Sequence, residues 1–113
     1  MKNIEFDKSK VFSTIGVLDY TPNSVVIKTI IKKLTGSINI ISFDSREAVK
    51  EKISPIDTFI QVIDGRGEIV IDDKSNILET GQSIIIPAHS RNTIRSSIRF
   101  KMLSTVIKSG YED

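Results

Sequence analysis

Six polar side chains in two short stretches of the sequence could carry chemistry. They are Lys52, Ser54, Asp57, Thr58, His89 and Asn92. An ammonium group can hold an anion, an imidazole or carboxylate can move a proton, and amides and hydroxyls can hydrogen-bond a ligand. A transition metal is a poor match, because neutral oxygens hold it weakly and one imidazole with one carboxylate falls short of a usual ligand set. We therefore expect binding of a small molecule without a metal or cofactor.

Each of these residues also has a purely structural interpretation. We expect His89, the single histidine, to be a solvated loop residue, with an acid–base role as the alternative. Asn92, if it is buried, must hydrogen-bond either a ligand or the protein, since an unpaired buried amide costs about 1–3 kcal/mol. Lys52 can stay solvated, pair with Asp57, or face an anionic ligand at the mouth of a cavity.

The composition describes one ordinary globular domain and excludes several classes of function. The chain has 113 residues, a net charge of +2 and 27% charged residues, with no basic stripe that would suit nucleic acid. It has no cysteine, which excludes zinc–thiolate sites and thiol catalysis. No apolar run has the length of a signal peptide or membrane span, so we expect a cytoplasmic protein without a membrane partner.

Runs rich in isoleucine, valine and threonine predict β-strands along most of the chain. The expected strands cover residues 24–33, 36–43, 57–63, 67–72, 83–87, 91–96 and 100–108. Turn sequences lie between them at residues 64–67, 72–76 and 79–82. Residues 45–52 are either a charged connecting loop, which we expect, or a short helical turn.

Short strands that alternate with turns, without a helical period between them, indicate a sandwich or barrel of antiparallel strands. We assign one all-β domain to residues 1–113. Residues 1–23 form an N-terminal arm or edge strands, and residues 24–108 form the barrel.

Several expected strands carry apolar residues on both faces, as the neighbours Phe59 and Ile60 illustrate, and residues 84–86 are all isoleucine. The outer face of a barrel needs cover when it is apolar. The N-terminal arm offers apolar residues for this, namely Phe6, Val11, Phe12 and Leu18. A symmetric homodimer is the alternative and the one we expect, because such an arm is small for the surface to be covered.

The spacing of glycine and proline resembles that of the cupin family over about residues 36–108. The second cupin motif has a glycine and a proline separated by five residues, as Gly81 and Pro87 are here. Gly65 matches the closing glycine of the first motif. Arg46 and His89 stand at two further positions where cupins have glycine. The resemblance implies a double-stranded β-helix, the RmlC-like jelly-roll barrel.

The same resemblance implies that the usual metal ligands have been replaced. The three histidine positions of cupins are occupied by Lys52, Ser54 and Asn92. Thr58 stands at the glutamate position, and Ser96 stands where the second motif has asparagine. These oxygens and one ammonium are unsuited to a transition metal.

Two functions remain open at this stage. The first is a non-catalytic, metal-independent binding or sensory module, whose barrel interior is lined by residues such as Lys52, Thr58, Ile60, Asn92 and Ile94. The second is a metal-independent isomerase or lyase that acts on a sugar or small carboxylic acid. In that case Lys52, Asp57 or His89 would move the proton.

Overall fold

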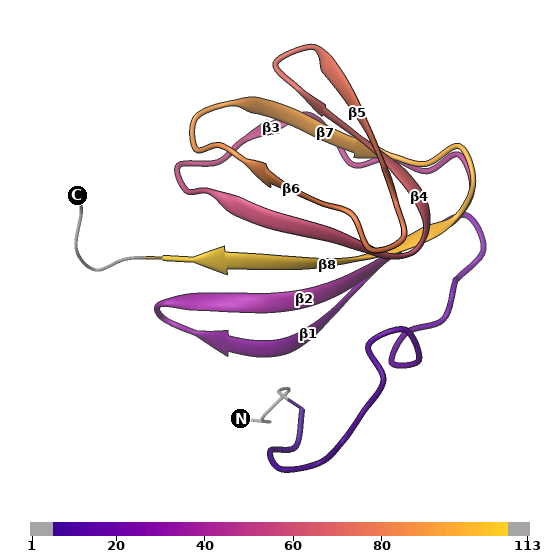
Figure 1. Ribbon diagram of the computed structural model, residues 1–113, viewed down its shortest axis with the longest axis vertical. Coiled ribbons are helices and arrows are strands. Elements are labelled where there is room, and N and C mark those ends of the chain that lie inside the picture. The colour runs from indigo at the N-terminus through magenta and orange to yellow at the C-terminus, as the bar shows by residue number, and fades with distance from the viewer. Residues whose placement is uncertain (1–5, 109–113) are drawn as a thin grey trace.

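A computed structural model describes residues 6–108, and this part of the chain contains strands but no helix. The strands are β1 (Val25–Lys33), β2 (Gly36–Phe43), β3 (Lys52–Ile53), β4 (Thr58–Ile71), β5 (Lys74–Glu79), β6 (Ser83–Ile86), β7 (Arg91–Arg95) and β8 (Phe100–Ile107). All pairings are antiparallel, and the sheet curls on itself (Figure 1). The all-β prediction is confirmed. The described part of the chain therefore has no helix that is long and apolar enough to cross a membrane.

The long strand β4 joins the two walls of the barrel. The strand order is β1-β2-β8-β4-β7-β3, with β5 and β6 also paired to β4. The first half of β4 pairs with β6 and β8, and its second half pairs with β5 and β7 (Figure 1). A register shift between Val62 and Asp64 and a positive φ of 87° at Gly65 mark the bend between the halves. We call the wall of β1, β2, β8, β6 and the first half of β4 sheet A, and the remainder sheet B.

Three predicted boundaries were wrong. The turn expected at residues 64–67 is a bulge inside β4, because a glycine in a strand can bend the chain without ending the ladder. The strand β5 was missed between two turn sequences. Asp72 and Asp73, both with positive φ, form the tight hairpin before it, and the polar residues that follow are strand. The short strand β3 lies at the end of residues 45–52, which otherwise form the expected loop and not a helical turn.

One end of the barrel is tightly packed. The rings of Phe43 and Phe100 stack with their centroids 4.6 Å apart and their planes 7° apart. A Cβ atom at Gly67 would come within 2.5 Å of the Phe100 ring, so glycine is what lets the ring lie against β4. Val62, Ile69, Leu78 and Phe100 are all buried there. We call these four residues the packed end.

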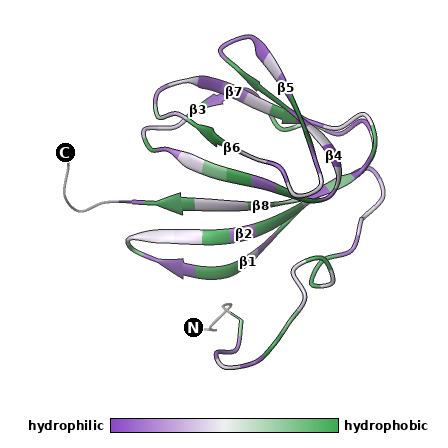
Figure 2. Cartoon of the chain, in the orientation of Figure 1, coloured by the Kyte–Doolittle hydropathy of each residue, from purple (hydrophilic) through white to green (hydrophobic). Residues whose placement is uncertain are grey.

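The N-terminal arm covers part of the outer face of sheet A. Its contacts include the Phe6 amide to the Ile30 carbonyl at 3.1 Å and the buried Ser42 hydroxyl to the Asp19 carbonyl at 3.2 Å. The Tyr20 hydroxyl donates to Asp64 at 2.7 Å, and burial together with this bond raises the pKa of Tyr20. Figure 2 shows hydrophobic residues along β1, β2, β6 and β8 of this sheet. Cover by the arm is incomplete, since Phe59 and Ile85 remain exposed.

Candidate functional site

A cavity of about 410 Å³ opens between the two sheets at the end opposite the packed end. Four of the six predicted site residues line it: Lys52, Ser54, Thr58 and Asn92. Ile60 and Ile94, also expected in the interior, belong to the same lining. The inner wall consists of buried residues such as Phe43 and Met102, and the mouth is formed by exposed residues such as Ile27, Lys52 and Ile53.

Asn92 is the most unusual polar residue of this cavity. It is only 2% exposed, on β7, and its side-chain amide nitrogen donates to the Lys52 carbonyl at 3.3 Å. That bond fixes the orientation of the amide, because the flipped group would bring two acceptor oxygens together. The Oδ1 atom then has no hydrogen-bond partner within residues 6–108. A buried acceptor in this state costs about 1–3 kcal/mol unless a bound group supplies a donor.

Lys52 brings a positive charge next to Asn92. The two residues face each other across the β3–β7 ladder, so their side chains lie on the same side of the sheet. Lys52 is exposed, and in the described part of the chain its ammonium has no ion pair with a carboxylate. Among the described residues that line the cavity it is the one charged side chain. The mouth of the cavity is therefore positive.

The hydroxyl groups of the lining differ in how far they are already used. Ser54 is occupied locally, since its hydroxyl donates to the Ile56 carbonyl at 3.2 Å and accepts from the Ile56 amide at 3.3 Å. No hydrogen bond engages the side chains of Thr58 and Ser104 within residues 6–108. These two hydroxyls are the ones left for a ligand.

Sequence reasoning missed two polar residues of the lining, Ser104 and Asn39. Ser104 lies two residues from Met102 and from Val106 on β8, and Asn39 lies two residues from Ile41 on β2. Each therefore shares the inward face with these neighbours. The period of two in a strand was the signal that could have found both.

Two predicted site residues lie outside the cavity lining. Asp57, expected in the interior, is exposed, and its carboxylate accepts a 2.7 Å hydrogen bond from the Ala88 amide. Successive side chains along a strand point to opposite faces. Thr58 points into the cavity at the start of β4, so Asp57 before it faces the loop after β6. His89 is exposed in that loop, as expected, and its backbone amide bonds the Ser54 carbonyl at 2.7 Å.

Arg46 and His89, which stand at two of the positions where cupins have glycine, adopt a glycine-like backbone conformation. Arg46 has φ 64° and His89 has φ 68°, both in the left-handed region that favours glycine. The backbone at these two positions therefore agrees with the glycine that the resemblance implies, although the side chains differ.

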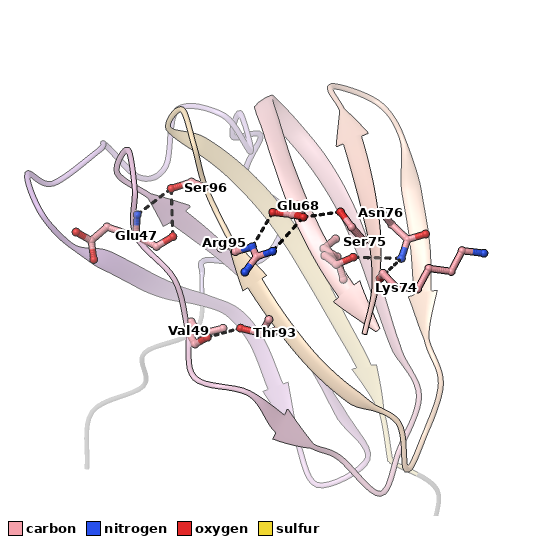
Figure 3. A network of polar contacts seen from close by, with 10 residues as sticks. Glu47, Val49, Glu68, Lys74, Ser75, Asn76, Thr93, Arg95 and Ser96 are labelled. Atoms are coloured by element: carbon pink, nitrogen blue, oxygen red, sulfur yellow. Dashed lines mark hydrogen bonds and ion pairs between the residues drawn. The ribbon is translucent and has the colours of Figure 1, made fainter. Parts of the chain in front are cut away.

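Hydrogen bonds hold residues 44–51, the loop that contributes Val49 to the cavity lining (Figure 3). The Thr93 hydroxyl donates to the Val49 carbonyl, and the Ser96 hydroxyl accepts from the Glu47 amide at 3.1 Å.

On the outside of sheet B, Arg95 donates to Glu68 at 2.6 Å, and Ser75 also donates to this carboxylate. The hydrogen bonds from Arg95 and Ser75 lower the pKa of Glu68.

The donor set of the cavity does not fit a transition metal. Within residues 6–108 no group of three or more His, Cys, Asp and Glu side chains lies close enough to hold a metal ion. Lys52, Ser54, Thr58 and Asn92 would offer one ammonium and neutral oxygens to such an ion. The cavity lining is therefore unsuited to chemistry that depends on a transition metal.

Comparison with known proteins supports the fold through solved structures. No family model and no curated protein matches the sequence. A conserved protein of unknown function from Streptococcus pyogenes superposes with a TM-score of 0.88 at 23% identity, over 98% of both chains. A cupin 2 conserved barrel domain protein from Leptotrichia buccalis gives 0.83 at 28% identity, over 86% of this chain and 47% of that one. A cupin superfamily protein from Desulfitobacterium hafniense gives 0.83 at 22% identity, over 95% and 97%. The chain has the RmlC-like cupin fold.

Proposed function

We propose that this protein is a metal-independent small-molecule binding or sensory module and that its ligand occupies the cavity between the two sheets. The observation that carries the proposal is the buried Oδ1 atom of Asn92, which lines the cavity and lacks a donor within the described residues. Folded proteins rarely leave such an atom unpaired. A ligand that donates to it would remove the cost.

The size and composition of the cavity support the same function. A volume of about 410 Å³ lies in the range of small-molecule sites, which are mostly apolar with a few placed polar groups. Asn92, Thr58 and Ser104 supply such groups among apolar neighbours such as Ile60 and Ile94.

The proposal also includes a cytoplasmic location for the protein. Cell fractionation tests this part of it.

The first experiment is a thermal-shift screen of untagged protein against small acids, alcohols and sugars, together with metal analysis of the same sample. Binding to the folded state raises the melting temperature by mass action. We expect a ligand-dependent rise with far less than one equivalent of transition metal, and we expect Asn92→Leu to reduce the rise. A stoichiometric metal, or a rise that Asn92→Leu leaves unchanged, would contradict the proposal.

An enzyme is the alternative, and the positions of its candidate proton-transfer groups do not favour it. Asp57 and His89 lie outside the cavity lining, which leaves Lys52 at the mouth. Turnover that disappears in Asp57→Ala or His89→Ala would favour the enzyme over the binding module.

We also propose a homodimer formed through the uncovered part of sheet A. A row of paired outward residues crosses the sheet from β6 to β1. In order they are Ile85, Phe59, Thr105, Ile38 and Ile31. The row contains no charge, so two copies could meet face to face without like-charge repulsion.

The dimer is tested by the molar mass in solution, measured by light scattering. Ile85→Asp places a charge in the row, where Ile85 is 60% exposed. Ile77→Asp is the matched control, since Ile77 is 56% exposed on β5 of sheet B. We expect a dimer that Ile85→Asp alone dissociates, and a monomeric parent protein would exclude it.

A further inference from the structure

The wall of the cavity is too apolar for a sugar. Its inner part is formed by buried aliphatic and aromatic side chains, among them Phe43, Ile60, Ile86 and Met102. A sugar carries hydroxyl groups around its whole ring, and each hydroxyl buried against such a wall without a partner costs about 1–3 kcal/mol. The occupant must therefore have an apolar body.

The polar groups that remain define two contacts of that occupant. Asn92 Oδ1 is an acceptor without a partner in the described chain, so the buried part of the occupant must carry a hydrogen-bond donor. A hydroxyl suits this position, because it can donate to Asn92 and still accept from Thr58 or Ser104 of the same lining.

The second polar contact lies beside the first, at the positive mouth. Lys52 is paired with Asn92 in the ladder and lines the cavity, and no described carboxylate lies in the lining to neutralise it. An ammonium attracts a carboxylate, and it would repel an amine. Because Lys52 is exposed, this attraction is screened by salt and weaker than a buried contact.

We infer that the ligand is a hydroxylated monocarboxylic acid with an apolar body. Its hydroxyl donates to Asn92 Oδ1 and its carboxylate lies near the Lys52 ammonium. This inference rests on the proposed function, because it assigns a chemical class to the occupant of the same cavity.

The test compares matched probes by calorimetry on the full chain. Mandelate carries an apolar ring, a hydroxyl and a carboxylate; phenylacetate lacks the hydroxyl; methyl mandelate lacks the charge; and glucose is polar throughout. Leucic acid and isocaproate repeat the hydroxyl comparison on an aliphatic body. We expect the hydroxyl to improve affinity roughly tenfold in both pairs. Loss of the charge should weaken binding by about threefold, and less at high salt.

Variants assign each preference to its residue. Asn92→Leu, with Asn92→Ser as a second variant, should bring the affinities for mandelate and phenylacetate to about the same value. Lys52→Gln should equalise mandelate and methyl mandelate. Lys50→Gln is the control, since it removes the same charge from an exposed residue outside the lining. A ratio of two affinities in one variant does not depend on how stably that variant folds.

Isoleucine methyl resonances locate the bound probe and separate the two levels of the proposal. Mandelate should shift the methyl signals of Ile60, Ile86 and Ile94 and leave those of Ile69 and Ile77 unchanged. If glucose or methyl mandelate moves the cavity signals more strongly than mandelate, the ligand class is wrong and the binding site stands. If no probe of any class moves the cavity signals, the proposed function fails with it.

Discussion

The two ends of this barrel are built from the same kinds of strand but are filled in different ways. At the packed end Val62, Ile69, Leu78 and Phe100 are at most 4% exposed, and the Phe100 ring lies directly against Gly67. At the other end the strands enclose about 410 Å³, and the amide oxygen of Asn92 in the wall has no hydrogen-bond partner among residues 6–108. Close packing at one end makes the hollow at the other end a local feature and not a loose core.

One aromatic ring belongs to both ends. Phe43 stacks on Phe100 with one side of its ring and lines the cavity, so it closes the packed end and forms part of the inner wall. Proteins rarely retain both a void and an unpaired polar group without a role for them. The comparison therefore supports the proposal that one end stabilises the fold and the other binds a ligand.

The largest expected effect is the loss of packing at the packed end. Phe100→Ala removes a fully buried ring that stacks on Phe43, and we expect the free energy of unfolding to fall by about 3–5 kcal/mol. Urea denaturation measures this change. A loss below about 1 kcal/mol would mean that this end is not close-packed, and the contrast with the hollow end would disappear.

The matched substitution at the hollow end should have a much smaller effect. Asn92→Leu removes one hydrogen bond to the Lys52 carbonyl and also removes the unpaired oxygen, and these two effects offset each other. We expect the free energy of unfolding of the ligand-free protein to change by less than about 1 kcal/mol in urea denaturation. A loss as large as that of Phe100→Ala would show that Asn92 is a structural residue.

Replacing two loop residues that have a positive φ by glycine should make the protein more stable. Arg46 and His89 hold a positive φ, so Arg46→Gly and His89→Gly should each raise the free energy of unfolding by about 0.5 kcal/mol. Lys50→Gly is the control, because the positive-φ residues of the described chain do not include Lys50, and it should be slightly destabilising. The explanation is wrong if denaturation curves give Lys50→Gly a higher free energy of unfolding than His89→Gly.

The smallest effect concerns pH, and it lies outside both ends. Hydrogen bonds from Arg95 and Ser75 lower the pKa of Glu68 below its ordinary value, so the folded protein holds the charged form better than the unfolded chain does. The resulting stabilisation is present above the ordinary glutamate pKa and is lost as the pH falls through the lowered pKa. Thermal melts of the parent and Glu68→Gln should therefore differ slightly at neutral pH and converge in acid. A difference in melting temperature between the two proteins that grows as the pH falls would contradict a lowered pKa of Glu68.

The fold was largely predictable because strand periodicity and turn residues act locally. The resemblance to the cupin motifs placed Lys52, Thr58 and Asn92 in one interior, and the structure brings all three to the cavity. Asp57 was misplaced, because it directly precedes Thr58 and neighbouring side chains along a strand point to opposite faces. The bulge at Gly65 and the strand β5 were also missed, because a glycine and a hairpin of two aspartates look alike as turns in sequence.

The central claim, that the hollow end is a ligand site built on Asn92 without a metal, is tested most directly by a crystal structure of untagged protein grown with mandelate. We predict density for the bound acid in the cavity, with its hydroxyl within hydrogen-bond distance of Asn92 Oδ1. An anomalous peak from a transition metal at that position, or an Asn92 amide that satisfies both its groups within the protein, would contradict the account.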